Sequence, residues 1–272
     1  MKVIRVFPRK TKATPDDPYA RIVTPPGFCD EADEIHISVA FTEDIPLAER
    51  LEKLWRVVAP VKIGGPAYKD HGSDFVPGMY VKKGYVITSR GCPNSCWFCA
   101  AWRNEGRTIR ELPITEGYNL LDNNILACSD NHIKAVFKML AEGKKKYKKP
   151  IEFTGGLEAK ILKQWHVDEL LKLKPKQLFF AYDTPDDYEP LVRAGKMFYR
   201  AGLSHKSHNL RCYVLCGYKG DTPGDAEKRL IATLKAGFMP MAMFFKDREN
   251  KNTKSREWLK LQRKWARPTI IT

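Results

Sequence analysis

Three of the seven cysteines fall within eight residues, and this spacing constrains the chain more than any other feature of its sequence. Cys92, Cys96 and Cys99 form a C-x3-C-x2-C pattern, in which a single loop can direct three thiolates toward one shared space. The number of cysteines is odd, and the first residues carry no apolar stretch typical of an export signal, so a disulfide framework is a poor interpretation. We interpret the three cysteines as metal ligands and expect a reducing, cytoplasmic location.

The number of thiolates limits the kind of metal centre. Structural zinc normally takes four ligands, and no nearby His or Cys completes a familiar zinc spacing. Electron-carrying iron–sulfur clusters also usually take four thiolates. A cubane cluster held by three would keep one iron open, which is useful only if another molecule binds there. The pattern therefore favours a catalytic cluster over its two alternatives, a zinc knuckle and an electron carrier.

The cysteine loop resembles the cluster motif of the radical S-adenosylmethionine (SAM) superfamily, with Phe98 in the aromatic position before the third cysteine. The resemblance implies a 4Fe-4S cluster, held by Cys92, Cys96 and Cys99, whose open iron takes the amino and carboxylate groups of SAM. It implies reductive cleavage of SAM to a 5′-deoxyadenosyl radical, and a reductant such as a flavodoxin or ferredoxin. The substrate stays open between a nucleotide or nucleic-acid base, weakly favoured by charge, and a small metabolite or peptide. The alternative is a non-catalytic zinc or iron–sulfur module that binds nucleic acid.

Residues 80–272 alternate between short apolar runs and amphipathic segments, which predicts an α/β fold with a parallel sheet and right-handed crossovers. The radical SAM resemblance implies a partial (β/α)6 TIM-like barrel over this range. The expected strands are Gly84–Thr88, Asn119–Ala127, Ile151–Thr154, Gln177–Tyr182, Arg211–Cys216 and Met239–Phe245, and the expected helices are Ser129–Gly143, Val167–Leu173, Tyr188–Ala201, Thr222–Ala236 and Lys254–Ala266.

Residues 1–79 predict a separate small α/β region. Its strand–helix–strand unit ends in Gly-Gly-Pro-Ala and resembles part of the domain that precedes the barrel in cobalamin-dependent radical SAM enzymes. This region lacks the D-x-H-x-x-G motif of those domains, so we expect no cobalamin. The expected elements are strands Val3–Phe7, Ile35–Phe41 and Val61–Ile63, a loop over Arg9–Pro26, and a helix over Pro46–Val58 with Leu47, Leu51, Leu54 and Val58 on one face.

Three predicted strand ends carry polar groups that the resemblance assigns to SAM. The run Asp122-Asn123-Asn124 would accept hydrogen bonds from the SAM amino group. Gly155 and Gly156 would let the backbone approach a ligand closely, with Glu158 facing the amino group or a substrate cation. Asp183 would bind the ribose hydroxyls. The alternatives are ordinary turns at the first two strand ends and a helix cap at the third.

The chain is strongly basic, with 47 Lys and Arg against 32 Asp and Glu, a formal net charge of +15. This balance favours contact with nucleic acid or another polyanion. Much of the charge lies over Lys246–Arg267, where Trp258, Leu261 and Trp265 recur at helical spacing and predict the buried face of a terminal helix. No apolar run is long enough for a membrane span, so we expect no membrane partner.

Overall fold

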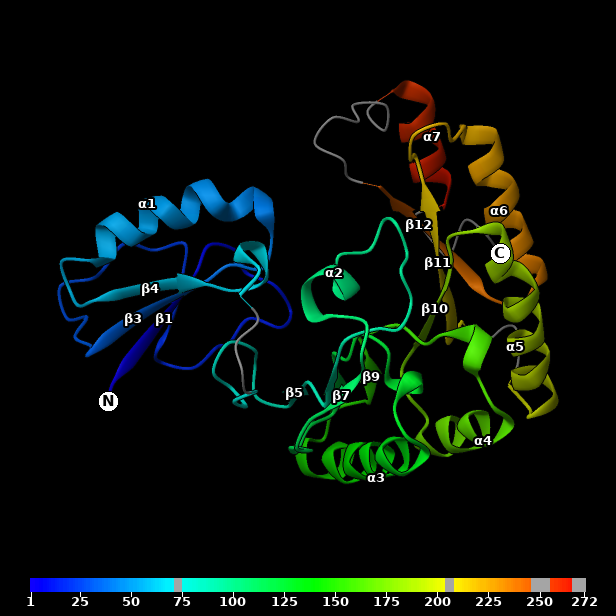
Figure 1. Ribbon diagram of the computed structural model, residues 1–272, viewed down its shortest axis with the longest axis horizontal. Coiled ribbons are helices and arrows are strands. Elements are labelled where there is room, and N and C mark those ends of the chain that lie inside the picture. The colour runs from blue at the N-terminus through cyan, green and yellow to red at the C-terminus, as the bar shows by residue number, and fades with distance from the viewer. Residues whose placement is uncertain (71–74, 204–207, 246–254, 266–272) are drawn as a thin grey trace.

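The computed structural model describes residues 1–70, 75–203, 208–245 and 255–265. These residues form a mixed α/β structure with parallel sheets and seven α-helices. Figure 1 shows a small N-terminal unit beside a larger unit that contains the cysteine loop. Among the described helices, none combines the length and the apolar character that crossing a membrane requires.

The N-terminal unit is a parallel four-stranded sheet in the order β2-β1-β3-β4, with one helix across it (Figure 1). The alternating residues of β3 are buried on the helix-covered side, as its period-two pattern predicts. Strand β2 lies inside the segment expected to be a loop, and that expectation is wrong because the backbone of Arg5, Val6 and Phe7 pairs with it. The elements are β1 (Val3–Phe7), β2 (Ala20–Ile22), β3 (Glu34–Ser38), α1 (Ile45–Trp55) and β4 (Val61–Gly64).

The buried stripe of helix α1 includes Leu51, as expected, with Leu47 and Val58 packed at its edge, but it also contains Ala48 and Trp55 and excludes Leu54. Ala48, Leu51 and Trp55 are buried against the sheet, whereas Leu54 is 48% exposed. The indole of Trp55 donates to the carbonyl of Thr24 at 3.0 Å, which satisfies its polar atom while the ring is buried. The large ring therefore sets the rotation of the helix, and Leu54 turns to solvent.

The larger unit continues the chain with short strands and longer helices in alternation. Its elements are β5 (Tyr85–Val86), β6 (Ser89–Arg90), α2 (Ala101–Glu105), β7 (Arg110–Glu111), β8 (Asn119–Leu120), α3 (Asp130–Tyr147), β9 (Glu152–Phe153), α4 (Gln164–Leu173), β10 (Leu178–Tyr182), α5 (Tyr188–Arg200), β11 (Leu210–Cys216), α6 (Pro223–Lys235), β12 (Met239–Phe244) and α7 (Arg256–Trp265). Single 3₁₀ turns lie at Thr42–Asp44, Pro66–Tyr68, Ile125–Ala127, Ala159–Ile161 and Pro185–Asp187.

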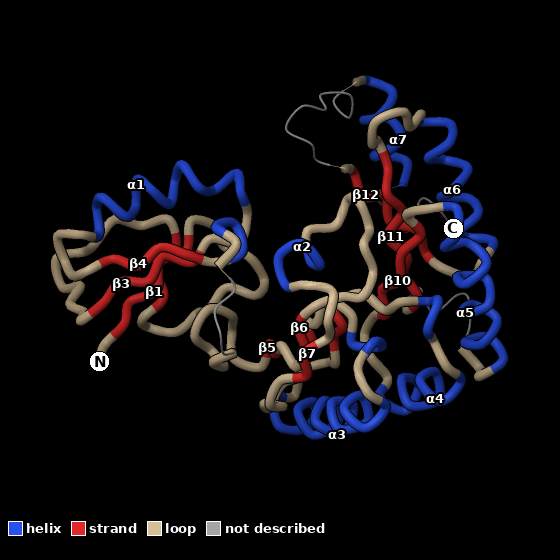
Figure 2. The backbone as a smooth tube through the Cα atoms, viewed as in Figure 1, coloured by secondary structure: helices blue, strands red, loops and turns tan. Residues whose placement is uncertain are grey.

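Six parallel strands of this unit form two three-stranded sheets, β5-β8-β9 and β10-β11-β12, each in chain order. Backbone hydrogen bonds connect the two sheets: Leu157 donates to Phe179 at 2.8 Å, and Lys176 donates to Ile151 at 2.9 Å. Helices α3 to α6 lie along the outer side of the strands, and α2 lies on the inner side (Figure 2). One apolar core, which includes Val136, Phe153, Phe180 and Val214, fills the space between strands and outer helices.

Helix α3 begins where the sequence indicated and extends one turn further. The hydroxyl of Ser129 caps it by accepting from the amide of His132 at 3.2 Å. The strand before it is shorter than expected, because β8 ends at Leu120 and the rest of Asn119–Ala127 is a turn and a 3₁₀ segment. Helix α7 buries Trp258, Leu261 and Trp265, which confirms the packing interpretation of these residues. Residues 254 and 266 at the expected helix ends, like 246–253 of the basic stretch, lie outside the described residues.

Candidate functional site

The cysteine loop leaves strand β6 and is closed at its base. The amide of Cys92 donates to the carbonyl of Gly106 at 3.1 Å, and Arg90 forms an ion pair with Glu105 at 2.6 Å. Both side chains of this pair are largely buried, with 13% and 8% of their surfaces exposed. The short antiparallel pairing of β6 with β7 continues the closure. The loop is therefore a constrained segment on a fixed base.

Gly91 at the start of the loop is required by the backbone. Its φ is +93°, a conformation that L side chains rarely adopt. A Cβ at this position would also lie 2.3 Å from the carbonyl oxygen of Thr108. The glycine therefore brings the outgoing and returning strands of the loop together immediately before the first cysteine.

The thiols of Cys92 and Cys96 line a cavity of about 360 Å³ at the carboxyl ends of the parallel strands. Cys99 is positioned nearby: its amide donates to the carbonyl of Cys96 at 3.1 Å, and its sulfur accepts from the amide of Ala101 at 3.4 Å. Burial, reinforced by the neighbouring thiols, raises the pKa of both Cys92 and Cys96. The loop therefore brings the three cysteines together at one side of the cavity.

The side chains of α2 hold this loop in place. The indole of Trp102 donates to the carbonyl of Cys96 at 2.8 Å, and Arg103 donates to the carbonyl of Trp97 at 2.5 Å. These bonds occupy backbone acceptors between the second and third cysteines. Contacts within the protein therefore fix the loop geometry, and the side chains of Cys92 and Cys96 line the cavity.

Asn124 and Glu158 form the wall beside Cys92. The Asn124 amide donates to a Glu158 carboxylate oxygen at 2.6 Å and lies 3.9 Å from the Cys92 sulfur. The side-chain oxygen of Asn124 is buried and has no hydrogen-bond partner. A buried acceptor without a donor is costly in a folded protein. This wall is therefore suited to a ligand that carries hydrogen-bond donors, such as an ammonium group.

Asp183 lines the opposite wall, at the end of β10. Burial, and next the negative charge of Asp187, raises the pKa of Asp183 to about 7. Asp187 is itself anchored: it accepts from the amide of Thr184 at 2.8 Å and pairs with Lys160 at 2.9 Å. Although burial opposes ionisation of Asp187, these hydrogen bonds lower its pKa. Asp187 therefore has a lowered pKa, whereas the pKa of its neighbour Asp183 is raised toward neutrality.

Asp122 lies outside this cavity, behind its wall. Its carboxylate accepts three hydrogen bonds, from the Thr88 amide at 2.6 Å, the Thr88 hydroxyl at 2.7 Å and the Ser89 hydroxyl at 2.7 Å. Burial raises its pKa against the effect of these donors. Gly155 packs on the same residue, because a Cβ there would lie 1.9 Å from the Asp122 carbonyl oxygen. Both residues thus position the strand ends rather than face the thiols.

Most of the other expected residues do gather at the cavity. Phe98, Asn123, Asn124, Gly156, Glu158 and Asp183 line it together with the thiols of Cys92 and Cys96. The residues that the sequence analysis did not single out are Arg90, Glu105, Thr184 and Asp187. The run Asp-Thr-Pro-Asp-Asp held a signal for the last two, since it can place a capping carboxylate beside a strand end.

The donor set can be tested against the implied cofactor. Among the described residues, no three His, Cys, Asp or Glu side chains are gathered to hold one metal ion. A cubane makes a different demand, because its thiolates bind separate irons around one rim. Soft thiolates around a common cavity, with a buried unpaired acceptor beside them, fit that demand.

Comparison of the chain with protein-family models and with curated proteins returns no match.

Proposed function

We propose that the protein is a radical SAM enzyme, in which Cys92, Cys96 and Cys99 hold a 4Fe-4S cluster. The observation that carries the proposal is the composition of one cavity. Two thiols of the loop, the unpaired oxygen of Asn124 and the carboxylates of Glu158 and Asp183 come from separate segments of the chain to line it. That combination matches a metal centre beside a ligand with ammonium and hydroxyl groups.

The cysteines and the residues beside them each have a defined role in this proposal. The three thiolates bind the cluster, and their metal binding requires the loss of protons that burial retains on Cys92 and Cys96. Asn124 and Glu158 accept hydrogen bonds from the SAM amino group. A bound and reduced cluster would supply the electron for reductive cleavage of SAM, with methionine as the other product.

Asp183 and Phe98 would complete the SAM site. The Asp183 carboxyl can accept from one ribose hydroxyl in its ionised form and donate to an acceptor in its neutral form, because its pKa lies near neutrality. Phe98 contributes an apolar surface at the cavity. Asp122 and Gly155 act through the residues they support, by fixing the ends of β8 and β9.

We further propose that the six parallel strands form a partial (β/α)6 barrel with the site at its carboxyl-terminal end. The strands follow chain order in each sheet, and the bonds from Leu157 to Phe179 and from Lys176 to Ile151 join the sheets. The cavity residues follow the ends of β6, β8, β9 and β10. Catalytic sites of α/β barrels lie at this end. A small reductant protein, such as a flavodoxin or ferredoxin, would supply the electrons in a cytoplasmic setting.

Anaerobic reconstitution tests the proposed function directly. The protein is loaded with iron and sulfide, mixed with SAM and dithionite, and the products are analysed by mass spectrometry. We expect 5′-deoxyadenosine and methionine in equal amounts, and neither product from a Cys96→Ser variant treated in the same way. A protein that binds iron and sulfide stoichiometrically but forms no 5′-deoxyadenosine contradicts the proposal, and stoichiometric zinc in place of iron supports the alternative zinc module.

A further inference from the structure

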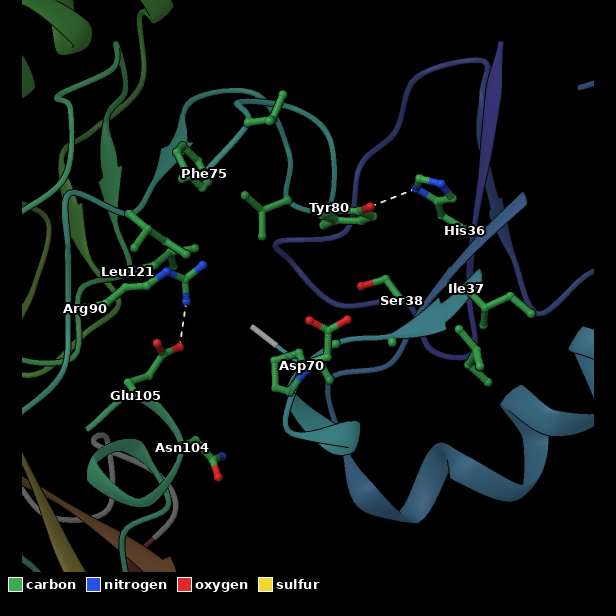
Figure 3. A pocket seen from close by; sticks show the side chains of 18 of the residues that line it. His36, Ile37, Ser38, Asp70, Phe75, Tyr80, Arg90, Asn104, Glu105 and Leu121 are labelled. Atoms are coloured by element: carbon green, nitrogen blue, oxygen red, sulfur yellow. Dashed lines mark hydrogen bonds and ion pairs between the residues drawn. The ribbon is translucent and has the colours of Figure 1, made fainter. Parts of the chain in front are cut away.

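A second cavity, of about 580 Å³, lies between the N-terminal unit and the larger unit (Figure 3). This volume falls within the range of sites that hold small organic ligands. One side is formed by the ends of β3 and β4, and the other by the base of the cysteine loop and the segment after β8. Asn123 lines both this cavity and the one that contains the thiols. The two cavities therefore lie next to each other and share Asn123 as a lining residue.

The N-terminal wall has the form of a ligand site in an open parallel sheet. Ligands of such sheets bind beyond the carboxyl ends of the strands. Ser38 ends β3 and Gly64 ends β4, and both line the cavity. Gly65 follows with a φ of +105°, and a Cβ there would lie 2.8 Å from the carbonyl oxygen of Val39. Gly65 thus lets the ends of β3 and β4 approach closely, while the Asp70 carboxylate packs over Gly64, where a Cβ would lie 2.3 Å from its oxygen.

An oriented aromatic ring borders the cavity at the same wall. The hydroxyl of Tyr80 is hydrogen-bonded to Nδ1 of His36 at 2.8 Å, and the two rings stack with centroids 6.0 Å apart. Nε2 of His36 contacts Glu34 at 2.9 Å, and Glu34 in turn accepts from Lys62 at 2.8 Å. Figure 3 shows the Tyr80 hydroxyl turned toward His36, so that the ring borders the cavity. These contacts hold the planar ring of Tyr80 in one orientation at the cavity wall.

The opposite wall offers amide groups and balanced charge. Arg90 is paired with Glu105 at 2.6 Å, while Nε of Arg90 is buried without a hydrogen-bond partner. Asn104 and Asn123 add side-chain amides that both donate and accept. The carboxylate of Asp70 is directed toward the cavity from the N-terminal side (Figure 3). A ligand in this cavity would therefore contact side-chain amides that form hydrogen bonds and the planar ring of Tyr80, and would not be surrounded by charges of a single sign.

We infer that this cavity binds a nucleobase, as part of a nucleoside or of a base turned out of a nucleic-acid strand. A planar heterocycle with donors and acceptors on its edge matches an aromatic platform combined with Asn and Asp side chains. The role of that base as the substrate of the radical reaction rests on the proposed function, because only then does the adjoining cavity supply a reactive group. The binding itself depends on the second cavity alone.

The test uses the full chain without iron and the four ribonucleosides adenosine, guanosine, cytidine and uridine as probes, with binding measured by equilibrium dialysis. We expect at least one nucleoside to bind. Base–aromatic stacking of about 1–3 kcal/mol corresponds to a loss of about 5-fold to 150-fold in affinity for Tyr80→Ala. Tyr80→Phe keeps the ring and should stay within a few fold of wild type. Phe28→Ala, an exposed aromatic outside the cavity, is the matched control and should bind unchanged.

The outcomes separate this inference from the proposed function. Absence of binding by all four nucleosides, or equal affinity of wild type and a folded Tyr80→Ala variant, overturns the inference even if SAM is cleaved. Stoichiometric binding of cobalamin that Tyr80→Ala abolishes also overturns it, because the cavity then belongs to that cofactor. Nucleoside binding by a protein that never assembles a cluster supports the cavity assignment and refutes the radical SAM function.

Discussion

Arg90 and Glu105 form an ion pair at 2.6 Å across the base of the cysteine loop, with little of either side chain exposed. Arg110 reaches the second oxygen of the same carboxylate at 3.3 Å. The pair spans fifteen positions of the chain and closes the loop beside the Cys92–Gly106 backbone bond. It also faces the second cavity, so one contact supports the geometry of both sites.

Removing the carboxylate of this pair should destabilise the fold strongly. Glu105→Ala leaves the Arg90 guanidinium buried without its counter-charge, which typically lowers the free energy of unfolding by about 3–5 kcal/mol. The matched control is Glu52→Ala in helix α1, whose partner Arg56 is 64% exposed, with an expected loss of about 1 kcal/mol or less. Urea unfolding followed by circular dichroism measures both. Equal losses in the two variants would show that the loop base is not held by this pair.

The three loop cysteines should be needed together for iron. Each single change of Cys92, Cys96 or Cys99 to Ala removes one of three thiolates, so iron content and the brown colour of the reconstituted protein should fall to background. Cys29→Ala and Cys128→Ala serve as controls, because Cys29 is exposed and Cys128 is buried in the apolar core. Full iron content in any one loop variant would refute the ligand assignment.

Asn124 should matter for SAM and not for iron. Asn124→Ala removes the unpaired oxygen and the donor to Glu158, and loss of a hydrogen bond to a charged ligand group costs about 1.5–3 kcal/mol. SAM affinity should therefore fall by about 10-fold or more, as measured by equilibrium dialysis on reconstituted protein. Gln164→Ala, in which an exposed amide is lost from α4, should leave SAM affinity unchanged. Unaltered affinity in Asn124→Ala would remove this residue from the site.

Asp183 should make the iron-free protein less stable as pH rises. Its folded pKa of about 7 lies above the ordinary value of 3.8, so its contribution to stability is full below about pH 4 and is lost as pH rises through 7. A hydrogen bond with the Leu215 backbone and the charge of Arg229 lower the pKa of Asp183, and so oppose part of the increase that burial and Asp187 cause. Asp183→Asn should therefore gain up to about 4 kcal/mol relative to wild type at pH 8 and little at pH 4. A stability difference that does not change with pH would show that Asp183 ionises normally.

The charged face of α7 should bind nucleic acid in a salt-dependent way. Arg256, Lys260 and Arg263 are exposed while the other face is buried, so a triple change to Glu leaves the core intact. Three or four phosphate contacts on duplex DNA would lower affinity by about 40-fold to 150-fold between 50 and 200 mM salt. The triple variant should bind a duplex oligonucleotide more weakly, with a flatter slope and unchanged iron content. Binding identical to wild type would leave this face without such a role.

The period of the apolar residues was enough to find most elements of the fold. The first strand, Val3–Phe7, has the expected bounds, and helix α3 starts after the expected cap at Ser129. Strand β2 was missed because its three residues are only half buried and depend on pairing with β1. The shift of the α1 face was missed because helical spacing alone cannot weigh one Trp against two Leu.

Some residues of the candidate site were predicted from the sequence and others were not. Those at strand ends follow from local patterns, whereas contacts between residues far apart in the sequence do not. Residues placed at strand ends, such as Asn124, Glu158 and Asp183, follow from the alternation of strands and helices. Asp122 belongs to the same run as Asn124, yet it lies behind the wall, where it accepts from Thr88 and Ser89. The run follows the end of β8 at Leu120 and leads into a 3₁₀ turn, so strand alternation could not predict where its side chains lie. The Arg90–Glu105 pair depends on a hairpin whose two-residue strands carry no periodic signal.

The joint between the two three-stranded sheets passes beneath the thiol-lined cavity. Glu158 lies in the segment that follows β9, and Asp183 directly follows β10, while the backbone hydrogen bonds of Leu157 and Lys176 connect the two sheets. The distance between the two carboxylates is therefore set by the backbone contacts that join the two sheets, as well as by the side-chain rotamers of Glu158 and Asp183.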